Sequence, residues 1–292
     1  MMIKLKLKKN AKKVDKFLLK FLKKQKKSLL ITPMKYGIVS GGKKIRSTII
    51  FDTGKMLKVK EKKLLSICTA VECIHSYSLI HDDLPCMDND LVRRGKPSTH
   101  KKFGEATAVL AGNSLLTLAF EIISDKKNFI SNKQKNEIIN LLSYCSGHTG
   151  IAGGQELDLK FENKRKKLNQ IIDMQKKKTG RLFNFCFQSV AIIANKNKKE
   201  REALGKIGEE VGLLFQLVDD YLDLKGSKKL LGKPIKKDNK KGKSTLINLL
   251  GYEKAHKYAE NLNKKILLKL KKHGKNSSYL IDTIEFIKKR NF

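Results

Sequence analysis

The stretch EALGKIGEEVGLLFQLVDDYLDL, residues 202–224, carries the pattern that decides the fold class. Its apolar residues recur at spacings of three and four, as on one face of an α-helix, and show no sustained alternation of the kind found in a β-strand. Near its end lie Asp219, Asp220 and Asp223, and on a regular helix Asp219 and Asp223 point within about 40° of each other. Carboxylates that share a face repel each other, so this helix end needs either solvent or a cation.

The same helical spacing recurs along most of the chain. It is found in residues 64–81, 106–123, 138–151 and 168–194. Only four prolines occur, and none lies between Pro97 and Pro234, so the strongest helix breaker is missing from a long stretch. No repeat and no change of composition marks a boundary. We therefore expect an all-α fold, a single large helical bundle forming one domain over residues 1–292, with ligands bound between facing helices.

The composition bears on partners and on compartment. The chain has 64 Lys and Arg against 28 Asp and Glu, a formal net charge of +36. Such an excess is typical of proteins that bind nucleic acid or an anionic surface. Here, however, lysines occur in nearly every segment, as A+T-rich coding would also produce, and the aromatic residues are mostly phenylalanines at core-like positions. We expect no nucleic-acid partner. Five cysteines without a CxxC pair favour reduced thiols in a cytoplasmic protein.

The lysine-rich residues 1–27 contain no continuous apolar region of the kind that a targeting signal has. The apolar residues among 17–22 mark one face of an amphipathic helix, which either packs on the body of the protein or lies on a membrane surface. The longest uncharged run, residues 106–120, is shorter than the ~20 residues that a membrane span needs. We expect no stable membrane insertion.

Another acidic cluster lies earlier in the chain: DDLPCMDND, residues 82–90, has four aspartates and is called the first acidic cluster, and residues 219–223 are called the second. Asp82 and Asp88 are six residues apart, roughly 240° of rotation in a regular helix, so they would face different ways. Pro85 lies between them, and we expect the helix to end, kink or bulge near residues 84–87 so that Asp88 turns back. Mg²⁺ binds one or two carboxylates and completes its octahedron with water and phosphate oxygens. Two facing acidic clusters therefore predict a diphosphate held by several ions.

Basic residues suited to phosphate accompany the acids. GGKKIR, residues 41–46, precedes a helix and combines two glycines, which allow close backbone approach, with Lys43 and Arg46 on one helix face. Arg93 and Arg94 directly follow the first acidic cluster, and arginine can hold phosphate oxygens bidentately. These residues predict that the phosphates are bound by cations as well as by metal.

Two other motifs do not carry the function. GKSTL, residues 242–246, resembles the end of a P-loop, but that motif needs glycine where Lys237 stands, so we reject a nucleotide site. Cys73, His75 and His81 have no matching second half of a zinc motif. Hydrogen-bonding roles fit these side chains better, and His75 is a candidate phosphate donor.

Together these motifs resemble those of the trans-isoprenyl diphosphate synthases, most closely the bacterial farnesyl diphosphate synthases. The chain contains, in the family's order and nearly end to end, GGKxxR, ECIHSYSLIHDDLPxMD, KFGEATAVLAG, GGQxxDL, KTG, FQxxDDxLD and GKxxxxDxxxGKST. The resemblance implies an isoprenoid synthase fold and a homodimer that condenses isopentenyl diphosphate with dimethylallyl or geranyl diphosphate to give farnesyl diphosphate. The alternative product is geranylgeranyl diphosphate or another chain length. A basic binding protein without catalysis would leave the paired acidic clusters unexplained.

The resemblance also implies a role for each site residue. About three Mg²⁺ ions would be bound by Asp82, Asp88 and Asp219, with Asp83, Asp220 and Asp223 as supporting acids. The allylic diphosphate would be held by Arg93, Lys178 and Lys233. Isopentenyl diphosphate would be held by Lys43, Arg46, His75 and Arg94. The catalytic set would be Lys178, Thr179 and Gln216, of which Thr179 and Gln216 face the developing carbocation. The chain length would be limited by Tyr77 and the adjacent Ser78.

Four positions depart from the family's pattern. Asn89 and Leu91 stand where acids are frequent, Lys44 where arginine is usual, and Ser47 where proline is usual. All the proposed ligands remain, so we expect activity, and the departures bear on the affinity for the third ion and for the substrates.

Overall fold

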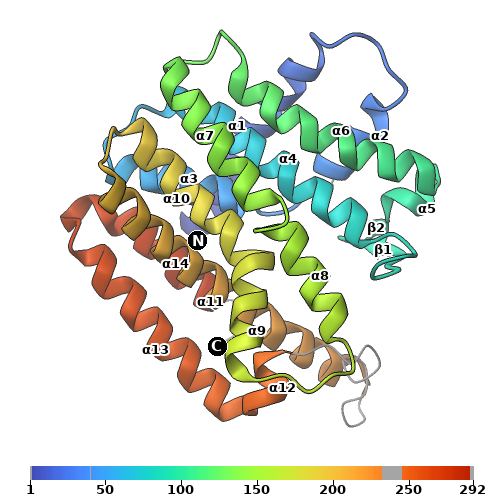
Figure 1. Ribbon diagram of the computed structural model, residues 1–292, viewed down its shortest axis with the longest axis vertical. Coiled ribbons are helices and arrows are strands. Elements are labelled where there is room, and N and C mark those ends of the chain that lie inside the picture. Colours follow the sequence, from blue (N-terminus) through green and yellow to red (C-terminus); the bar gives the residue numbers. More distant parts are fainter. Residues whose placement is uncertain (1, 40, 232–244, 290–292) are drawn as a thin grey trace. The chain divides into compact units, whose positions relative to one another are not determined.

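The computed structural model describes residues 2–39, 41–231 and 245–289; the side chains of residues 223–231 are not included in that description. Within these ranges the chain is mostly helical, as predicted (Figure 1). The longer helices are α1 (Met2–Leu22), α2 (Ile31–Val39), α3 (Ile45–Met56), α4 (Leu65–Asp82), α6 (Glu105–Ser124), α7 (Asn132–Ser146), α8 (Ile151–Phe161), α9 (Leu168–Gln175), α10 (Arg181–Ile193), α11 (Lys198–Leu231), α13 (Tyr252–Lys271) and α14 (Ser278–Lys289). Shorter helical segments are η1 (Glu61–Lys63), α5 (Thr99–Phe103), η2 (Lys176–Gly180), α12 (Leu246–Leu250) and η4 (Gly274–Ser277).

Three details differ from the expected pattern. The window 138–151 is not one helix, because α7 ends at Ser146 and α8 begins at Ile151 after the segment GHTG. Helix α11 continues to Leu231. A small antiparallel hairpin is formed by β1 (Val92–Arg93) and β2 (Lys96–Pro97), with Val92 opposite Pro97. The hairpin holds the two arginines of the sequence RRG in a fixed turn.

The contacts divide the chain into two compact units. The first contains the described residues of 1–54, 58–140 and 192–194, and the second those of 55–57, 141–191 and 195–292. The single domain over residues 1–292 stays a prediction.

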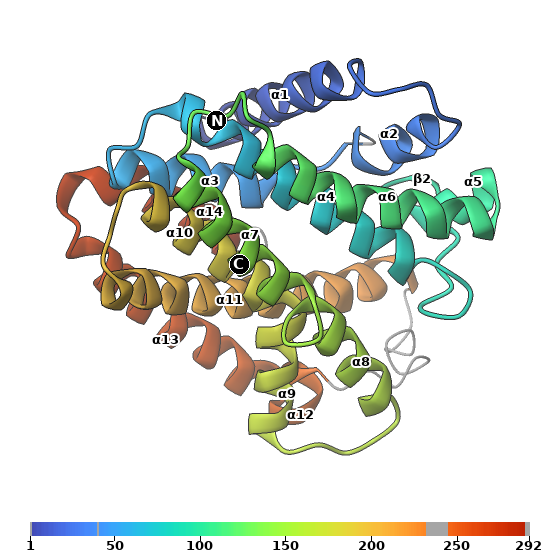
Figure 2. The ribbon, with the colours of Figure 1, turned by 45° about the horizontal axis from the view of Figure 1, so that its top comes forward.

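Helix α4 is the centre of the first unit. It is apolar on most of its circumference, with Ile67, Val71 and Ile74 fully buried, and α1 and α6 pack along it (Figure 2). Gly112 of α6 permits the close contact with α4, because a Cβ atom there would lie 2.2 Å from Nε2 of His81. That nitrogen is 3.1 Å from the carbonyl oxygen of Val109.

Helix α11 is the centre of the second unit, where it packs against α13, α14 and η2. Its periodic apolar residues are buried, among them Leu214, Leu217 and Tyr221. The Tyr221 hydroxyl donates a hydrogen bond of 2.8 Å to the carbonyl oxygen of Tyr252 at the start of α13. The sequence pattern of residues 202–224 thus packs as a core helix.

Among the described residues, one helix is long and apolar enough to cross a membrane. It is α6, which is 20 residues long and therefore exceeds the run of residues 106–120 on which the sequence expectation was based. The most apolar window of α6 is 44% buried within the structure. A core helix of a globular protein has these same properties.

Candidate functional site

The first acidic cluster lies where α4 ends. The helix stops at Asp82, and the chain then turns back so that the backbone N–H of Asp88 donates to the carbonyl oxygen of Asp82 at 2.8 Å. The N–H of Asn89 donates to the carbonyl oxygen of Leu84 at 3.0 Å, and Asn89 has a φ of +50°, a conformation that asparagine tolerates better than most residues. The helix therefore ends before Pro85 and the backbone of Asp88 returns to that of Asp82, as the sequence predicted.

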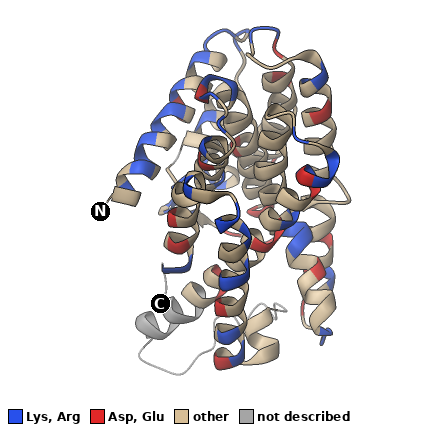
Figure 3. Ribbon diagram, turned by 90° about the vertical axis from the view of Figure 1, so that its left-hand side faces the viewer, with Lys and Arg blue, Asp and Glu red and all other residues tan. Residues whose placement is uncertain are grey.

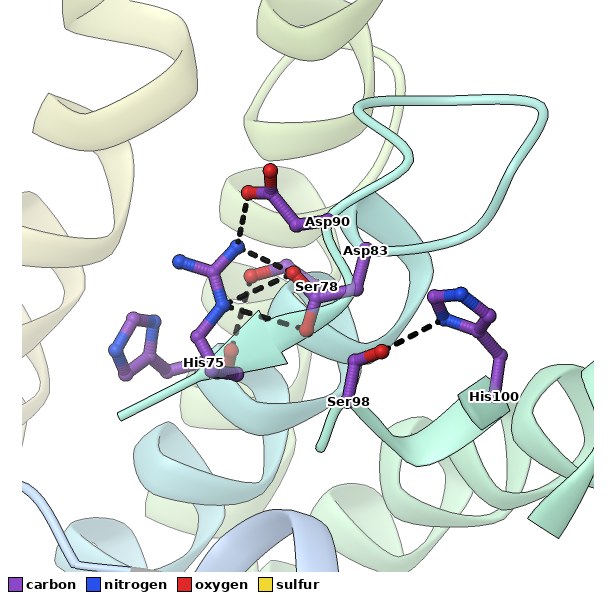
Figure 4. Close-up of polar contacts among 7 residues, drawn as sticks. His75, Ser78, Asp83, Asp90, Ser98 and His100 are labelled. Carbon is purple, nitrogen blue, oxygen red and sulfur yellow. Dashed lines mark hydrogen bonds and ion pairs between the residues drawn. The ribbon is translucent and has the colours of Figure 1, made fainter. Parts of the chain in front are cut away.

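Asp83 and Asp90 hold Arg93 of the hairpin (Figure 4). Nε of Arg93 donates to Oδ1 of Asp83 at 2.9 Å, and Nη2 contacts the same carboxylate and Oδ2 of Asp90, the latter at 3.1 Å. Burial raises the pKa of Asp83, and the pairing with Arg93 opposes that shift. These bonds use Nε and Nη2, so the Nη1 edge of the partly exposed guanidinium takes no part in them. Asp83 therefore orients Arg93, and its role as a supporting acid for the metal ions stays a prediction.

Arg94 is bound to the glycine-rich loop. Its Nη1 donates a 2.7 Å hydrogen bond to the carbonyl oxygen of Gly41. Gly42 has a φ of +100°, and a Cβ atom there would lie 2.8 Å from Cζ of Arg94. Both features require glycine, since a side chain would be strained and would displace the guanidinium.

His75 lies within this basic group. Burial lowers the pKa of His75 well below its ordinary value, and the charges of Arg46 and Arg94, followed by those of Lys44 and Arg93, lower it further. The imidazole is therefore neutral at neutral pH, with one N–H to donate. The structure thus brings together four of the predicted residues, Arg46, His75, Arg93 and Arg94, within the first unit.

A buried pair that the sequence did not indicate lies behind these cations. Oε1 of Glu72, on α4, accepts the hydroxyl of Ser47 at 2.7 Å and the backbone N–H of Ser47 at 3.1 Å. Ser47 is in the first turn of α3, where backbone N–H groups have no partner within the helix. Glu72 thus caps α3 from a neighbouring helix and fixes the turn that carries Arg46. Burial lowers the pKa of Arg94, and the negative charge of Glu72 partly offsets this by raising it.

Lys44 has a structural position. Its side chain is buried, and Nζ donates to the carbonyl oxygen of Ile38 at 3.0 Å and pairs with Asp15 at 3.1 Å. Two of the departures from the family's pattern, Lys44 and Ser47, therefore make internal contacts.

The two predicted chain-length residues lie on the last turns of α4. Tyr77 packs edge to face on His81, with 5.1 Å between ring centroids, and burial together with the charge of Asp82 raises the Tyr77 pKa. The hydroxyl of Ser78 donates to the carbonyl oxygen of His75 at 3.0 Å (Figure 4). A substitution at Tyr77 would therefore remove the ring contact with His81 and leave the Ser78 hydrogen bond in place.

In the second unit, the motif KTG lies in η2, a π-helical turn between α9 and α10. Periodicity predicted a helix over residues 168–194, and the π turn interrupts the regular hydrogen bonding without ending it. Two glycines allow neighbouring helices to approach it. A Cβ atom on Gly154 of α8 would lie 2.1 Å from the backbone nitrogen of Lys178, and one on Gly212 of α11 would lie 2.6 Å from Cα of Gly180. Such turns frequently occur at functional sites.

A hydrogen-bonded chain links this turn to the second acidic cluster. The Thr179 hydroxyl donates to Oε1 of Gln216 at 2.9 Å, and Nε2 of Gln216 donates to Oδ1 of Asp220 at 2.9 Å. Nε2 of Gln175 lies 3.4 Å from Oδ2 of Asp220. Asp220 therefore sets the orientation of the Gln216 amide, whose oxygen accepts the hydrogen bond from the Thr179 hydroxyl.

Two further residues of the GGQxxDL motif adjoin Lys178, and sequence reasoning assigned neither a role. Asp158 pairs with Nζ of Lys178 at 2.6 Å. Gln155 is buried, and neither atom of its amide has a hydrogen-bond partner among the described residues. The presence of the GGQxxDL motif was the sequence signal that could have pointed to these two residues. A buried amide without partners is a group that a ligand or a water molecule would satisfy.

The donor atoms of both acidic clusters suit Mg²⁺ in kind, since they are carboxylate oxygens. Among the described side chains, no group of three or more His, Cys, Asp or Glu could hold a metal by itself. Mg²⁺ needs only one or two protein carboxylates, since water and phosphate oxygens complete its coordination. The Asp223 side chain and Lys233 lie outside the described residues.

Comparison with known proteins gives a consistent result. A family model described as "Polyprenyl synthetase" matches residues 27–284. The farnesyl diphosphate synthase of Escherichia coli (strain K12) is 40% identical over 267 residues, which cover 90% of this chain and 89% of that protein. The farnesyl diphosphate synthase of Bacillus subtilis (strain 168) is 42% identical over 231 residues, which cover 79% of this chain and 76% of that protein. The crystal structure of an FPP/GFPP synthase from Zymomonas mobilis superposes with a TM-score of 0.88 and 35% identity, covering 98% and 100% of the two chains.

Proposed function

Because the chain belongs to the polyprenyl synthetase family, we propose that this prenyltransferase is a farnesyl diphosphate synthase. It is a polyprenyl diphosphate synthase, whose substrates are isopentenyl diphosphate and an allylic diphosphate. The observation that carries the proposed product is the 40% identity to a bacterial farnesyl diphosphate synthase over 90% of the chain. Geranylgeranyl diphosphate is the second candidate product.

The first unit supplies the groups for isopentenyl diphosphate. Lys43, Arg46 and Arg94 provide positive charge, and the neutral His75 donates one N–H to a phosphate oxygen. The carbonyl oxygen of Gly41 holds the Arg94 guanidinium, so this side chain has less conformational entropy to lose on binding. Glu72 fixes the helical turn that carries Arg46 through its bonds to Ser47. These contacts orient the nucleophilic double bond.

The leaving group is the allylic diphosphate, held by Arg93, Lys178 and Lys233. When bound, Mg²⁺ adds the positive charge that stabilises this diphosphate as the carbon–oxygen bond breaks, and Asp82, Asp88 and Asp219 would hold the ions. Asp83 and Asp158 fix Arg93 and Lys178 in position. Stabilisation of the leaving group by preorganised charge is the main catalytic contribution.

Thr179 stabilises the allylic cation. Because its hydroxyl hydrogen is donated to Gln216, the lone pairs of the Thr179 oxygen remain for the electron-poor carbon. Asp220 prevents the Gln216 amide from turning its NH₂ group toward Thr179. After the new carbon–carbon bond forms, the proton lost from the product passes to the released diphosphate.

Assembly and product length complete the proposal. Val109 and Leu110 on α6 are exposed apolar residues, as expected of an interface in a cytoplasmic homodimer. Tyr77 would limit the growing chain at 15 carbons.

The test is incubation with labelled isopentenyl diphosphate, dimethylallyl or geranyl diphosphate and Mg²⁺, followed by chain-length analysis. We expect a C15 product that disappears with EDTA. Asp82→Asn and Asp219→Asn should each lower turnover by roughly two orders of magnitude or more, whereas Asp282→Asn, an exposed acid on α14, should leave it unchanged. A mainly C20 product would show that the protein is a geranylgeranyl diphosphate synthase instead. The absence of any Mg²⁺-dependent product would refute the proposed prenyltransferase activity.

A further inference from the structure

An exposed basic surface runs along α1 and the loop after it. Five of its lysines recur every four residues and thus form one row on the helix: Lys4, Lys8, Lys12, Lys16 and Lys20, all exposed. Exposed lysines on either side of the row and in the loop widen it: Lys9, Lys23, Lys24, Lys26 and Lys27. We call these ten residues the α1 basic surface. Figure 3 shows the repeated basic residues along the helix that begins at the label N.

The opposite side of α1 is attached to the first unit. Leu7, Val14 and Leu18 are buried. Two inward lysines are paired, Lys6 with Asp52 at 2.8 Å and Lys13 with Glu61 at 2.7 Å. None of the ten lysines of the α1 basic surface forms an ion pair with a described residue. Like charges four residues apart destabilise a helix, so α1 depends on its packing to stay helical. An external anion bound to the row of lysines would reduce their repulsion and stabilise the helix.

A second lysine-rich helix shows that this arrangement is not a general result of the composition. On α13, Lys265 and Lys269 both pair with Glu210, at 3.1 and 2.7 Å. Glu260 of the same helix pairs with Lys288 at 3.4 Å. On α13 the lysine excess thus gives a mixed, partly neutralised surface, whereas every exposed charged residue of α1 is a lysine.

Apolar residues at the ends of the surface indicate which anion it fits. Met2 and Leu5 are 85% and 69% exposed at one end, and Leu29 is 96% exposed after the lysines at the other. A nucleic acid offers its phosphates to lysine but no apolar layer for an exposed leucine. A bilayer interface offers both anionic headgroups and the edge of the acyl chains.

We propose that the α1 basic surface binds reversibly to anionic lipid bilayers, with the lysines at the headgroups and Leu29 and Leu5 entering the interface. The helix lies on the bilayer without crossing it, because its apolar side is already packed against the protein. Each lysine near such a surface contributes about fivefold in affinity, and added salt weakens the attraction. The proposal is independent of the product formed in the active site.

The test uses the full chain and co-sedimentation with vesicles of phosphatidylcholine alone or with about 40% phosphatidylglycerol. One variant neutralises the row, with Lys→Gln at positions 4, 8, 12, 16 and 20. The matched control makes the same change at five exposed lysines of α13 and its C-cap: Lys254, Lys257, Lys264, Lys271 and Lys272. Both variants carry the same net charge. Leu29→Ser tests the apolar contact separately, and circular dichroism with solution activity verifies folding.

Wild type and the α13 control should sediment with anionic vesicles and not with neutral ones, and high salt should release them. The row variant should bind at least 100-fold more weakly, since five lysines at about fivefold each are removed, and Leu29→Ser should bind several-fold more weakly with full activity. Equal losses in the row variant and the control would overturn the proposal. So would binding of wild type to neutral vesicles at the same strength, or displacement of the vesicles by a short nucleic-acid duplex at physiological salt.

Discussion

Replacing Ser47 by alanine should destabilise the protein measurably. The Ser47 side chain is fully buried, and its hydroxyl donates at 2.7 Å to the carboxylate of Glu72, which is itself buried. A second acceptor, the carbonyl oxygen of Cys68, lies at 3.1 Å, but one hydroxyl hydrogen serves the shorter contact. Ser47→Ala keeps the backbone N–H bond to Glu72 and removes the hydroxyl. It therefore isolates one charge-assisted hydrogen bond in the interior.

The magnitude follows from that geometry. A hydrogen bond to a charged group contributes about 1.5–3 kcal/mol to the free energy of unfolding, and a buried carboxylate that loses a donor is not rehydrated. For a chain of this size, 1 kcal/mol corresponds to about 2–4 °C in melting temperature, so we expect Ser47→Ala to melt about 3–12 °C lower. Because Ser47 also positions the turn that carries Arg46, the KM for isopentenyl diphosphate should rise more than kcat falls.

Ser189 provides the control. It is also fully buried, but its hydroxyl has no hydrogen-bond partner among the described residues. Ser189→Ala removes an unsatisfied polar group and should be neutral or slightly stabilising. Both variants are measured by differential scanning calorimetry in one buffer. If Ser47→Ala melts within about 1 °C of wild type, or no lower than Ser189→Ala, the argument that Glu72 needs this hydroxyl is wrong.

Three further outcomes follow from the site. Asp158→Asn should raise the KM for the allylic diphosphate about tenfold, because Lys178 loses the carboxylate at 2.6 Å that orients it; an unchanged KM would contradict this. Tyr77→Ala should release products longer than C15, and a product that is still only C15 would remove Tyr77 as the limit. The pKa of His75 is lowered in the folded protein, so as the pH falls through about 6.5 this imidazole is protonated in the unfolded chain but not in the folded one. Wild type should therefore lose more stability than His75→Gln between about pH 7.5 and 5.5 in thermal melts, and equal losses would refute a neutral His75.

The elements with a strong 3.6-residue pattern could be predicted, and α4, α6 and α11 lie where their apolar residues recur. The return of Asp88 toward Asp82 also followed from the rotation per residue and the proline between them. The break between α7 and α8 could not be predicted, because apolar residues recur at helical spacing on both sides of the segment GHTG. The π turn η2 shifts backbone hydrogen bonds by one residue, and hydrophobic periodicity does not report that shift.

The predicted binding residues were chosen by charge and by motif, so their internal partners remained hidden. Ser47 and Glu72 are separated by 25 positions, and Asp158 and Lys178 by 20. Pairing over such distances depends on how helices pack, through close contacts such as those of Gly112 and Gly154, and a single sequence does not encode it in any local pattern.

The carboxylates of this basic chain therefore have two separate tasks. Asp82, Asp88 and Asp219 are proposed to meet metal ions, whereas Asp83 and Asp158 bind the cations that are proposed to meet phosphate. An arginine or lysine already held by a carboxylate on one side loses little freedom when it binds phosphate on the other, but part of its charge is neutralised. Replacing Asp83 or Asp158 would thus keep the positive charge of the paired arginine or lysine but lose its orientation, so substrate affinity should fall while the salt dependence of binding stays the same. Replacing the arginine or lysine itself should reduce both the substrate affinity and its salt dependence.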